Sequence, residues 1–492
     1  MQLFWGDFHN HCNISYGFGS LENALAQAEK HLDFCCVTGH AMWPDIYPRN
    51  AETSFVVDFH QRGFAKLQEN WPRVLETVNR YNTDRLVTFQ SYEMHSSQYG
   101  DHHLISPDAD LPLIYRDSPK ELARDCGRRA IAIPHHIGYT PGYRGISWDA
   151  FDRDISPFVE VYSKHGSSMW EGGAFPYYHD MGPLDPRNTV EAGLRRGLAF
   201  SFAGSTDHHA GFPGSYGDGL TGVWAEEKSR EALWDAMRKG HLYAVTGDRI
   251  ACDFRLNDAF MGDTTSAERR SMHLQCEGDA PLALVSIYRN GRIVASTVPN
   301  PSRGTDPQKR YKLRLELGWG NSADPYHWEG EMKIDGGELI RVQPYYRGRN
   351  ALSPSDHEAN REANTNALDN GCGFDRNRCW FKCDTVRNIS TLHPQTNAFV
   401  FEICAEPDAV IELTVNGQTH SHRLSQLLDC GYTAHVKPWH SCAYKMYTAV
   451  PASCCRSTLE FDDVRESARD VYQAEVIQRN GCRAFVSPIF VD

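Results

Sequence analysis

The first 250 residues alternate short apolar runs with amphipathic segments. Helical periodicity, with apolar positions three and four residues apart, marks the segments 20–31, 64–81, 119–126, 188–195 and 230–239. Ser20 and Ser118 precede two of them and are suited to cap helix N-termini. Strands that alternate with helices are typical of a parallel sheet, so the pattern predicts an α/β fold. The apolar runs predict strands over 4–11, 32–38, 86–92, 130–133, 158–162, 198–203 and 241–245.

The pattern changes after about residue 250 to short alternating strands and turns. Leu284 to Tyr288 is followed by Arg289-Asn290-Gly291-Arg292, which indicates a hairpin. Residues 345–395 are rich in Asn, Arg, Asp and Gly with little periodicity, which predicts a long irregular insertion. We therefore expect two domains, an α/β domain over residues 1–250 and an all-β, sandwich-like domain over residues 251–492.

Polar clusters stand at the carboxyl ends of the predicted strands. His9 and His11 are two residues apart, so on a strand both imidazoles project from one face, as metal ligands do. In a (β/α) barrel the carboxyl ends of the strands converge on one face, where residues far apart in sequence meet. Clusters at successive strand ends favour metal binding over isolated loop histidines. The further clusters are Thr38-Gly39-His40, Glu93, His135-His136 and Asp207-His208-His209.

These ligand types predict a chemistry. Imidazole and carboxylate ligands suit Zn, Mn or Fe better than Ca. Two such ions roughly 3.5 to 4 Å apart can bind the attacking water and the leaving oxygen, and lower the pKa of that water. No Ser or Cys nucleophile is then required, and the chain has no Gly-x-Ser-x-Gly motif and no Gly-rich phosphate loop ahead of a Lys. The residues themselves therefore predict metal-assisted hydrolysis.

The composition limits the classes of binding partner and the cellular compartment that we expect. The formal net charge of −13 argues against nucleic acid or an anionic membrane as the main partner, and no run of 18 apolar residues is present. The 15 Cys include the adjacent pairs Cys35-Cys36 and Cys454-Cys455, which suit buried thiols in a reducing compartment. The chain starts in a predicted strand without a basic and apolar leader. We expect a cytoplasmic enzyme that acts on a small molecule.

Taken together, the motifs resemble those of the PHP (polymerase and histidinol phosphatase) superfamily, in their order and in their spacing. They are Gly6-Asp7-Phe8-His9-Asn10-His11, Val37-Thr38-Gly39-His40, Glu93, Pro134-His135-His136 and Gly204 to His209. The detail is more similar still to a PHP-like bacterial family known only as a domain of unknown function. That closer resemblance covers residues 1–290 and the C-terminal strand, through Ser205 to Gly214, Tyr243 to Ile250 and Ala484 to Val491.

The resemblance implies a distorted TIM barrel of the (β/α)7 type and a phosphoesterase that acts on a small, anionic, phosphorylated molecule. It also implies a centre of two or three divalent ions (Zn, Mn or Fe) with Glu93 as the bridging carboxylate. Of the doublets His102-His103 and His135-His136, the prediction favours His103 and His135. The ligands implied by the resemblance are His9, His11, His40, Glu93, His103, His135, Asp207 and His209.

Gly39 stands where the family has an Asp that supports the following His. This departure favours an alternative hypothesis, a barrel that has lost catalysis and serves as a binding module. A second alternative is metal-assisted cleavage of an ester, amide or glycosidic bond, or elimination from a sugar acid, on the same scaffold.

Three further residues near strand ends are candidates for catalysis. His165 follows the strand 158–162 and is interpreted as a ligand, a proton donor to the leaving group or a loop residue. Arg144 and Lys164 are candidates for holding an anionic substrate. Cys372, Cys379 and Cys383 fit no common zinc-finger spacing and are predicted to be structural thiols.

Overall fold

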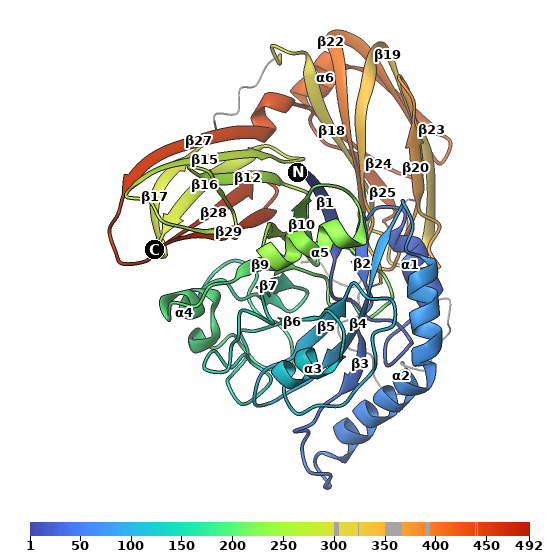
Figure 1. Ribbon diagram of the computed structural model, residues 1–492. Helices are drawn as coiled ribbons and strands as arrows, with labels where there is room; N and C mark the ends of the chain where they lie inside the picture. The colour runs from blue at the N-terminus through green and yellow to red at the C-terminus, as the bar shows by residue number, and fades with distance from the viewer. Residues whose placement is uncertain (300–304, 323, 350–366, 389–393, 438, 440) are drawn as a thin grey trace.

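The computed structural model of the chain describes residues 1–299, 305–322, 324–349, 367–388, 394–437, 439 and 441–492. The fold is mixed α/β, rich in sheet and with few helices (Figure 1). Within these residues, no helix combines the length and the apolar character needed to cross a membrane.

The helices of the first half follow the predicted periodicity. Ser20 and Ser118 cap α1 and α3 as predicted, since their side chains accept hydrogen bonds from the backbone N–H of Asn23 and Glu121. α2 begins ten residues earlier than predicted, at Ser54, because Val57, His60 and Gly63 of its first turns are buried against the body of the protein. The helices are α1 (Leu21–Ala28), α2 (Ser54–Arg80), α3 (Pro119–Asp125), α4 (Val190–Arg195), α5 (Arg230–Lys239) and α6 (Leu424–Asp429).

A 13-stranded sheet runs through both halves of the chain, in the order β17-β16-β28-β29-β11-β10-β1-β2-β4-β5-β6, with β14 beside β29 and β3 beside β4. A separate three-stranded sheet contains β8 (Gly166–Ser167), β7 (Phe158–Ser163) and β9 (Ser201–Gly204). The strands of the large sheet are β1 (Gln2–Asp7), β2 (Phe34–Cys36), β3 (Gly39–Met42), β4 (Val87–Met94), β5 (His102–Ser106), β6 (Ile131–Pro134), β10 (Leu220–Ala225), β11 (Leu242–Val245), β14 (Thr264–Thr265), β16 (Leu282–Arg289), β17 (Arg292–Thr297), β28 (Asp470–Gln478) and β29 (Arg483–Val491).

The predicted closed (β/α)7 barrel is not found, because the described strands form no closed hydrogen-bonded ring. Two strands that the pattern does not predict, β5 and β10, pair antiparallel with β4 and β1. Residues 95–101, which join β4 to β5, are fewer than the dozen or so that a parallel crossover needs. The pairing path ends at β6. There β7 packs beside β6, while β9 contacts β11, so two sheets rather than one ring frame the strand ends.

Some strands after residue 250 belong to the sheet of the first half. β16, β17, β28 and β29 extend the sheet of the first half, and β29 pairs with β11 through Ala244 opposite Phe485. Almost every residue of β29 is buried, as in a central strand and unlike the half-exposed strand of a sandwich. The short helix α6 also lies in this half.

Two other sheets complete the second half (Figure 1). A four-stranded sheet has the order β13 (Ala259–Phe260), β12 (Ala251–Leu256), β15 (Arg269–Glu277), β27 (Arg456–Val464). The main path of the nine-stranded sheet is β20 (Gly371–Phe374), β21 (Arg378–Thr385), β19 (Tyr326–Tyr345), β22 (Asn397–Val415), β18 (Arg310–Gly318), β25 (Ala443–Met446), β24 (Tyr432–His435), with β23 (Gln418–Arg423) beside β22 and β26 (Val450–Pro451) beside β18.

The predicted irregular insertion over 345–395 overlaps this sheet. Residues 350–366 and 389–393 of it lie outside the described residues, and the remainder contains β20 and β21. Cys379, Phe381 and Cys383 alternate inward along β21 and are buried, which agrees with the prediction that these cysteines are structural thiols. The polar composition around β21 concealed this period of two.

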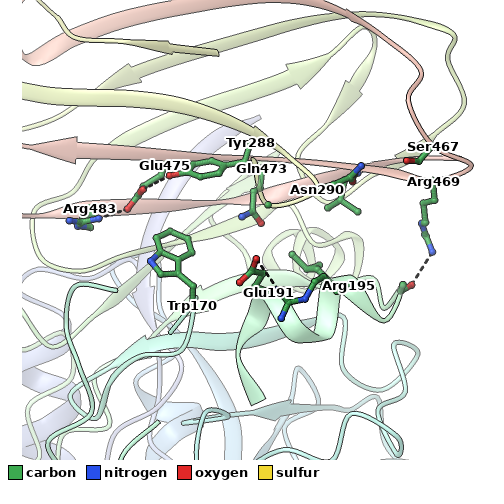
Figure 2. A pocket seen from close by; sticks show the side chains of 14 residues that line it. Trp170, Glu191, Arg195, Tyr288, Asn290, Ser467, Arg469, Gln473, Glu475 and Arg483 are labelled. Atoms are coloured by element: carbon green, nitrogen blue, oxygen red, sulfur yellow. Dashed lines mark hydrogen bonds and ion pairs between the residues drawn. The ribbon is translucent and has the colours of Figure 1, made fainter. Parts of the chain in front are cut away.

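An apolar layer lies directly beneath the polar strand ends. Phe8 is fully buried, with its ring centroid 5.0 Å from that of Phe34 on β2 and 5.4 Å from that of Phe158 on β7. These contacts draw three strands together below the site. A cavity opens between α4 and β28 (Figure 2).

Candidate metal centre

The segment that carries His9 and His11 is locked to the segment that carries Asp207. β1 ends at Asp7, short of the predicted strand end, and the Asp7 carboxylate accepts hydrogen bonds from the N–H and hydroxyl of Thr206 and the N–H of Gly214. Asp207 donates its backbone N–H to the His9 carbonyl and has φ of 49°. Such a conformation is uncommon outside glycine and persists only where the surroundings impose it.

His9, His11 and Asp207 point at one another and are all buried. The Nε2 atoms of the two histidines lie 3.0 Å apart. Asp207 Oδ1 is 3.1 Å from Nε2 of His11 and 3.3 Å from that of His9. Three potential ligand atoms therefore converge.

Glu93, at the end of β4, lies at the middle of the cluster. Its Oε1 is 3.0 Å from His135 Nε2. Its Oε2 is 3.4 Å from Nε2 of both His11 and His40, and 3.7 Å from that of His9. This Oε2 is buried without a hydrogen-bond partner. A carboxylate can thus face two sets of imidazoles, one through each oxygen.

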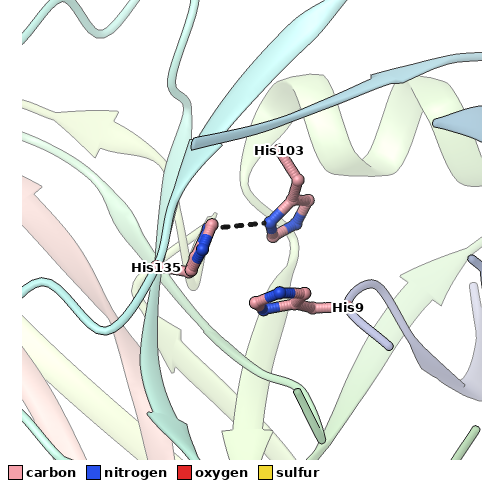
Figure 3. Close-up of side chains that lie close together, drawn as sticks. All are labelled: His9, His103 and His135. Carbon is pink, nitrogen blue, oxygen red and sulfur yellow. Dashed lines mark hydrogen bonds between the residues drawn. The ribbon is translucent and has the colours of Figure 1, made fainter. Parts of the chain in front are cut away.

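His103 and His135 form a second group with His9. Figure 3 shows the three rings directed toward one another: His103 lies on β5, and His135 and His9 follow the ends of β6 and β1. The ring centroid of His9 is 4.1 Å from that of His135 and 4.8 Å from that of His103. His102 faces the other side of β5, where its Nδ1 lies 2.9 Å from the Gly100 carbonyl, because successive side chains alternate along a strand.

His40 and His209 flank His11, with ring centroids 3.9 Å and 4.2 Å from it. The position before His40 has no room for a side chain, because a Cβ on Gly39 would lie 2.7 Å from Cδ1 of Leu67. Ser15 takes the supporting role instead: its hydroxyl oxygen accepts the His40 N–H at 3.0 Å and lies 3.1 Å from Nδ1 of that ring. His40 is therefore held in orientation by Ser15 although Gly39 stands in place of the Asp.

Replacing Ser15 with Ala is expected to lower metal affinity by about 10-fold to 100-fold, the range typical when a group that orients a ligand is removed. The Nδ1 of His40 would lose its neighbour and the ring its fixed orientation. Titration of metal-free protein with Zn²⁺ in competition with a chromophoric chelator measures this. Ser286→Ala, at a buried serine on β16, is the matched control and should leave the affinity unchanged. Equal affinity for Ser15→Ala and wild type would contradict the assigned role of Ser15.

The donor set fits divalent metal ions. Several groups of ligand atoms lie within 4.8 Å of one another, among them His9, His103 and His135, and also His11, His40 and His209. Glu93 Oε2 and His103 Nε2 are buried and have no hydrogen-bond partner. Burial, aided by neighbouring imidazoles, holds the pKa of His40, His103, His135 and His209 well below the usual value, which keeps the rings neutral as metal ligands must be.

Two further acidic side chains contact histidines of the site. Glu160 Oε2 lies 3.0 Å from His9 Nδ1, which turns the Nε2 of His9 inward. Asp101 Oδ2 lies 3.0 Å from His95 Nδ1 and 3.2 Å from His136 Nε2. Sequence reasoning left out Asp101 and interpreted Glu160 as a structural residue. The signal for Glu160 was a carboxylate in the middle of the apolar strand 158–162.

The three candidate catalytic residues lie in different places relative to the cluster. His165 joins the cluster, with Nε2 2.7 Å from Asp207 Oδ2 and Nδ1 2.8 Å from the Tyr139 hydroxyl. Arg144 lies outside it, donating from Nε to Asp101 Oδ2 at 2.7 Å. Lys164 is largely buried, its carboxylate neighbour being Asp218 with Oδ2 3.7 Å from Nζ. Burial lowers the pKa of Lys164 against the opposing effect of Asp218.

The chain is similar to several proteins in sequence. Residues 214–279 match the model of the family "Protein of unknown function (DUF3604)". An uncharacterized protein of Chlamydia pneumoniae is 24% identical over 326 residues, which cover 58% of this chain and 49% of that protein. One of Chlamydia muridarum is 29% identical over 199 residues, which cover 37% of this chain and 32% of that protein. The chain thus spans half or less of the length of these relatives.

Two solved structures also match this chain. One is a two-domain protein from Bacteroides vulgatus that contains a predicted PHP-like metal-dependent phosphoesterase, with 12% identity, a TM-score of 0.30, and coverage of 86% of this chain and 95% of that one. The other is a lesion-specific endonuclease from Pyrococcus furiosus, with 11% identity, a TM-score of 0.28, and coverage of 49% and 56%. At these TM-scores, the roles of the site residues rest on the geometry described above.

Proposed function

We propose that this protein is a metal-dependent hydrolase that cleaves a phosphoester of a small anionic molecule. The observation that carries the proposal is the buried Glu93 Oε2, which has no hydrogen-bond partner and faces the Nε2 atoms of three histidines at 3.4 to 3.7 Å. Leaving a buried carboxylate oxygen unpaired is costly unless a cation satisfies it. An arrangement of this kind is what a shared metal site requires.

The ligands assigned by this proposal divide between the two oxygens of Glu93. Bound divalent ions would activate water and offset charge on the leaving oxygen. Glu160 and Ser15 hold two of the ligand rings, so that little reorganisation accompanies binding. The proposed ligands are His9, His11, His40, Glu93, His103, His135, Asp207 and His209, with Zn, Mn or Fe as the ions.

His165 is the proton donor in this proposal. Its Nε2 lies 2.7 Å from Asp207 Oδ2, and its Nδ1 lies 2.8 Å from the Tyr139 hydroxyl oxygen. In this proposal the acid is the imidazolium, because loss of one proton then leaves a stable neutral ring. Nε2, beside the cluster, would pass its proton to the leaving oxygen, while Nδ1–H donates to the Tyr139 hydroxyl oxygen.

Lys164 and Arg144 have different parts in the proposal. Lys164 lies next in sequence to His165, and its Nζ is 3.7 Å from Asp218, which leaves hydrogen-bonding capacity for an anionic group of the substrate. Arg144 is a positioning residue. It donates from Nε to Asp101, and Asp101 in turn lies against His95 and His136.

Elemental analysis tests the centre itself. Protein purified without an affinity tag or added metal is expected to hold two or more equivalents of Zn, Mn or Fe, and His9→Ala with Asp207→Ala is expected to lose most of them. The matched control is His327→Ala with Asp384→Ala, which removes a His–Asp pair 2.8 Å apart on the nine-stranded sheet. It should leave the metal content unchanged. Wild type with less than half an equivalent, even after reconstitution, would leave the binding-module hypothesis in front.

A substrate panel tests the bond that is cleaved. Metal-loaded protein is expected to hydrolyse p-nitrophenyl phosphate or bis(p-nitrophenyl) phosphate, and not p-nitrophenyl acetate or a p-nitrophenyl glycoside. Turnover of the acetate or the glycoside alone would replace phosphoester cleavage with the second alternative. His165→Gln should reduce turnover while the metal content stays near that of wild type, since that residue is assigned to proton transfer.

A further inference from the structure

A second cavity, of about 690 Å³, lies between the two halves of the chain and shares no lining residue with the metal centre. Its size falls within the usual range for small-molecule pockets, and junctions of this kind are preferred places for them. Figure 2 shows its two walls: α4 with Trp170 on one side, and β16, β28 and β29 on the other. Nothing in the proposed function uses this cavity.

One wall is a single face of the sheet. Val471, Gln473 and Glu475 alternate along β28 and line the cavity, while the residues between them face the opposite side. Tyr288 on β16 stands directly opposite Gln473 in the register and donates its hydroxyl to Glu475 Oε2 at 2.9 Å. Polar groups are thus fixed in place on a rigid support.

Trp170 supplies an aromatic surface from the other wall. Its ring centroid is 6.1 Å from that of Tyr288, with the planes 30° apart. Trp170 lies three residues after β8, and its indole is only partly buried and lines the cavity. Leu194 of α4 adds an apolar contact beside it.

Gln473 has hydrogen-bonding capacity that the protein does not use. Its side chain is only 8% exposed, and its Oε1 is buried without a hydrogen-bond partner. Figure 2 shows the amide directed away from the strand, into the space in front of Glu191. A buried amide oxygen left unpaired is costly, which is the mark of a group positioned for a ligand.

Each arginine at the cavity has a carboxylate neighbour, although Nε of Arg483 has no hydrogen-bond partner. Arg483 Nη1 lies 2.6 Å from Glu475 Oε1, and Arg195 Nη1 lies 3.1 Å from Glu191 Oε1. Arg469 Nε lies 3.0 Å from Asp492 Oδ1. With no unbalanced charge among these groups, the cavity favours a neutral ligand that offers several hydroxyl groups.

We infer that this cavity binds a neutral carbohydrate, a monosaccharide or disaccharide, with a sugar face against Trp170 and its hydroxyls on Gln473 and Glu475. Sugars present C–H groups on one face and hydroxyls at the edge, which matches an indole beside an amide and a carboxylate. The site is distinct from the metal centre, and it would bind the sugar without taking part in hydrolysis.

Saturation-transfer NMR with wild-type protein tests this against glucose, galactose, N-acetylglucosamine, maltose, lactose and sucrose at millimolar concentration. At least one sugar is expected to receive saturation, and calorimetry then gives its affinity. Trp170→Leu and Gln473→Met are each expected to weaken that affinity by about tenfold or more. The controls Trp380→Leu and Gln418→Met lie on β21 and β23, and His9→Ala with Asp207→Ala disables the metal centre. All three should bind as wild type does.

Three results would overturn the inference. They are an absence of saturation transfer to every neutral sugar, binding of glucuronate or glucose 6-phosphate alone, and sugar binding that is lost with the metal-centre variant but kept by the two cavity variants. Thermal unfolding confirms that each variant is folded. Tyr288→Phe, which removes one hydroxyl only, is the further variant should Trp170→Leu fail to fold. It is expected to weaken sugar binding because Glu475 would lose one of the two groups that fix it.

Discussion

Glu93→Gln is expected to reduce hydrolysis by more than about 100-fold, beyond the effect of removing a group that only orients a ligand, and to remove at least one bound ion. The replacement keeps the shape of the side chain. It places an uncharged amide where Oε1 lies 3.0 Å from His135 Nε2 and Oε2 lies 3.4 Å from His11 and His40. An amide has one acceptor oxygen, so it cannot bridge the two groups of imidazoles.

Metal content per chain and the initial rate on the best phosphoester measure this together. Glu231→Gln is the matched control, since its side chain is 63% exposed on α5 and pairs with Arg129 rather than with a residue of the ligand cluster. If Glu93→Gln retained its full metal content and activity, Glu93 would not be the bridging group. The proposed division of the ligands would then have to be abandoned.

Arg270→Met is expected to destabilise the protein by about 3 to 5 kcal/mol, the cost of leaving one member of a buried ion pair alone. Arg270 and Asp470 are both fully buried, with Nη1 2.5 Å from Oδ2, and Arg270 also donates to the Tyr472 hydroxyl at 2.9 Å. The pair joins β15 of the four-stranded sheet to β28 of the large sheet. Urea unfolding followed by circular dichroism gives the free energy of unfolding.

The effect of Arg270→Met should depend on pH. Burial raises the pKa of Asp470, but hydrogen bonds from Arg270, two backbone amides and Asn290 outweigh it, so the pKa lies below its ordinary value. A lowered folded-state pKa contributes stability above the unfolded-state pKa of about 3.9, and this is lost as the pH falls below it. The deficit of the variant should therefore shrink in acid.

Two variants make the Arg270 prediction specific. Arg255→Met, on the neighbouring strand β12, breaks a pair with Asp253 in which the arginine is 47% exposed, and should cost less than about 1 kcal/mol. Arg270→Met with Asp470→Asn removes both charges, keeps an acceptor for the backbone amides of Glu466 and Ser467, and should recover part of the lost stability. A deficit for Arg270→Met no larger than that for Arg255→Met would contradict the importance given to the buried pair.

The ligand cluster was the part of the site most accessible from sequence. His9, His11 and Asp207 stand in short polar motifs directly after apolar runs, and the convergence of strand ends brings such motifs together whatever the details of the sheet. The structure does collect all eight predicted ligands and His165 in one place. Their roles as ligands stay a prediction until metal is measured.

The supporting groups could not be predicted because they act across the fold. Ser15 reaches His40 from a loop, and Glu160 reaches His9 from β7. A hydroxyl or carboxylate of this kind carries no local signal of its partner. The doubt raised by Gly39 could be answered only by seeing what stands beside His40.

The order of the strands could not be predicted from the sequence for a related reason. β5 and β10 are short, and their antiparallel pairing interrupts what the strand–helix pattern predicts as a parallel sheet. The pairing of β29 with β11 joins segments that no local periodicity links. Hydrophobic pattern selects which residues are buried, whereas the choice of neighbour depends on pairing across the whole chain.

The place of β29 between β28 and β11 also constrains how the protein is made. β11 leaves the ribosome long before residues 483–491, so its edge stays open and prone to association during synthesis. Folding of the large sheet must then wait for a contact of very long sequence separation, which is a slow event. We expect the first half of the chain to need chaperone protection until that strand arrives, and a chain that ends before residue 483 to aggregate rather than to fold as a smaller unit.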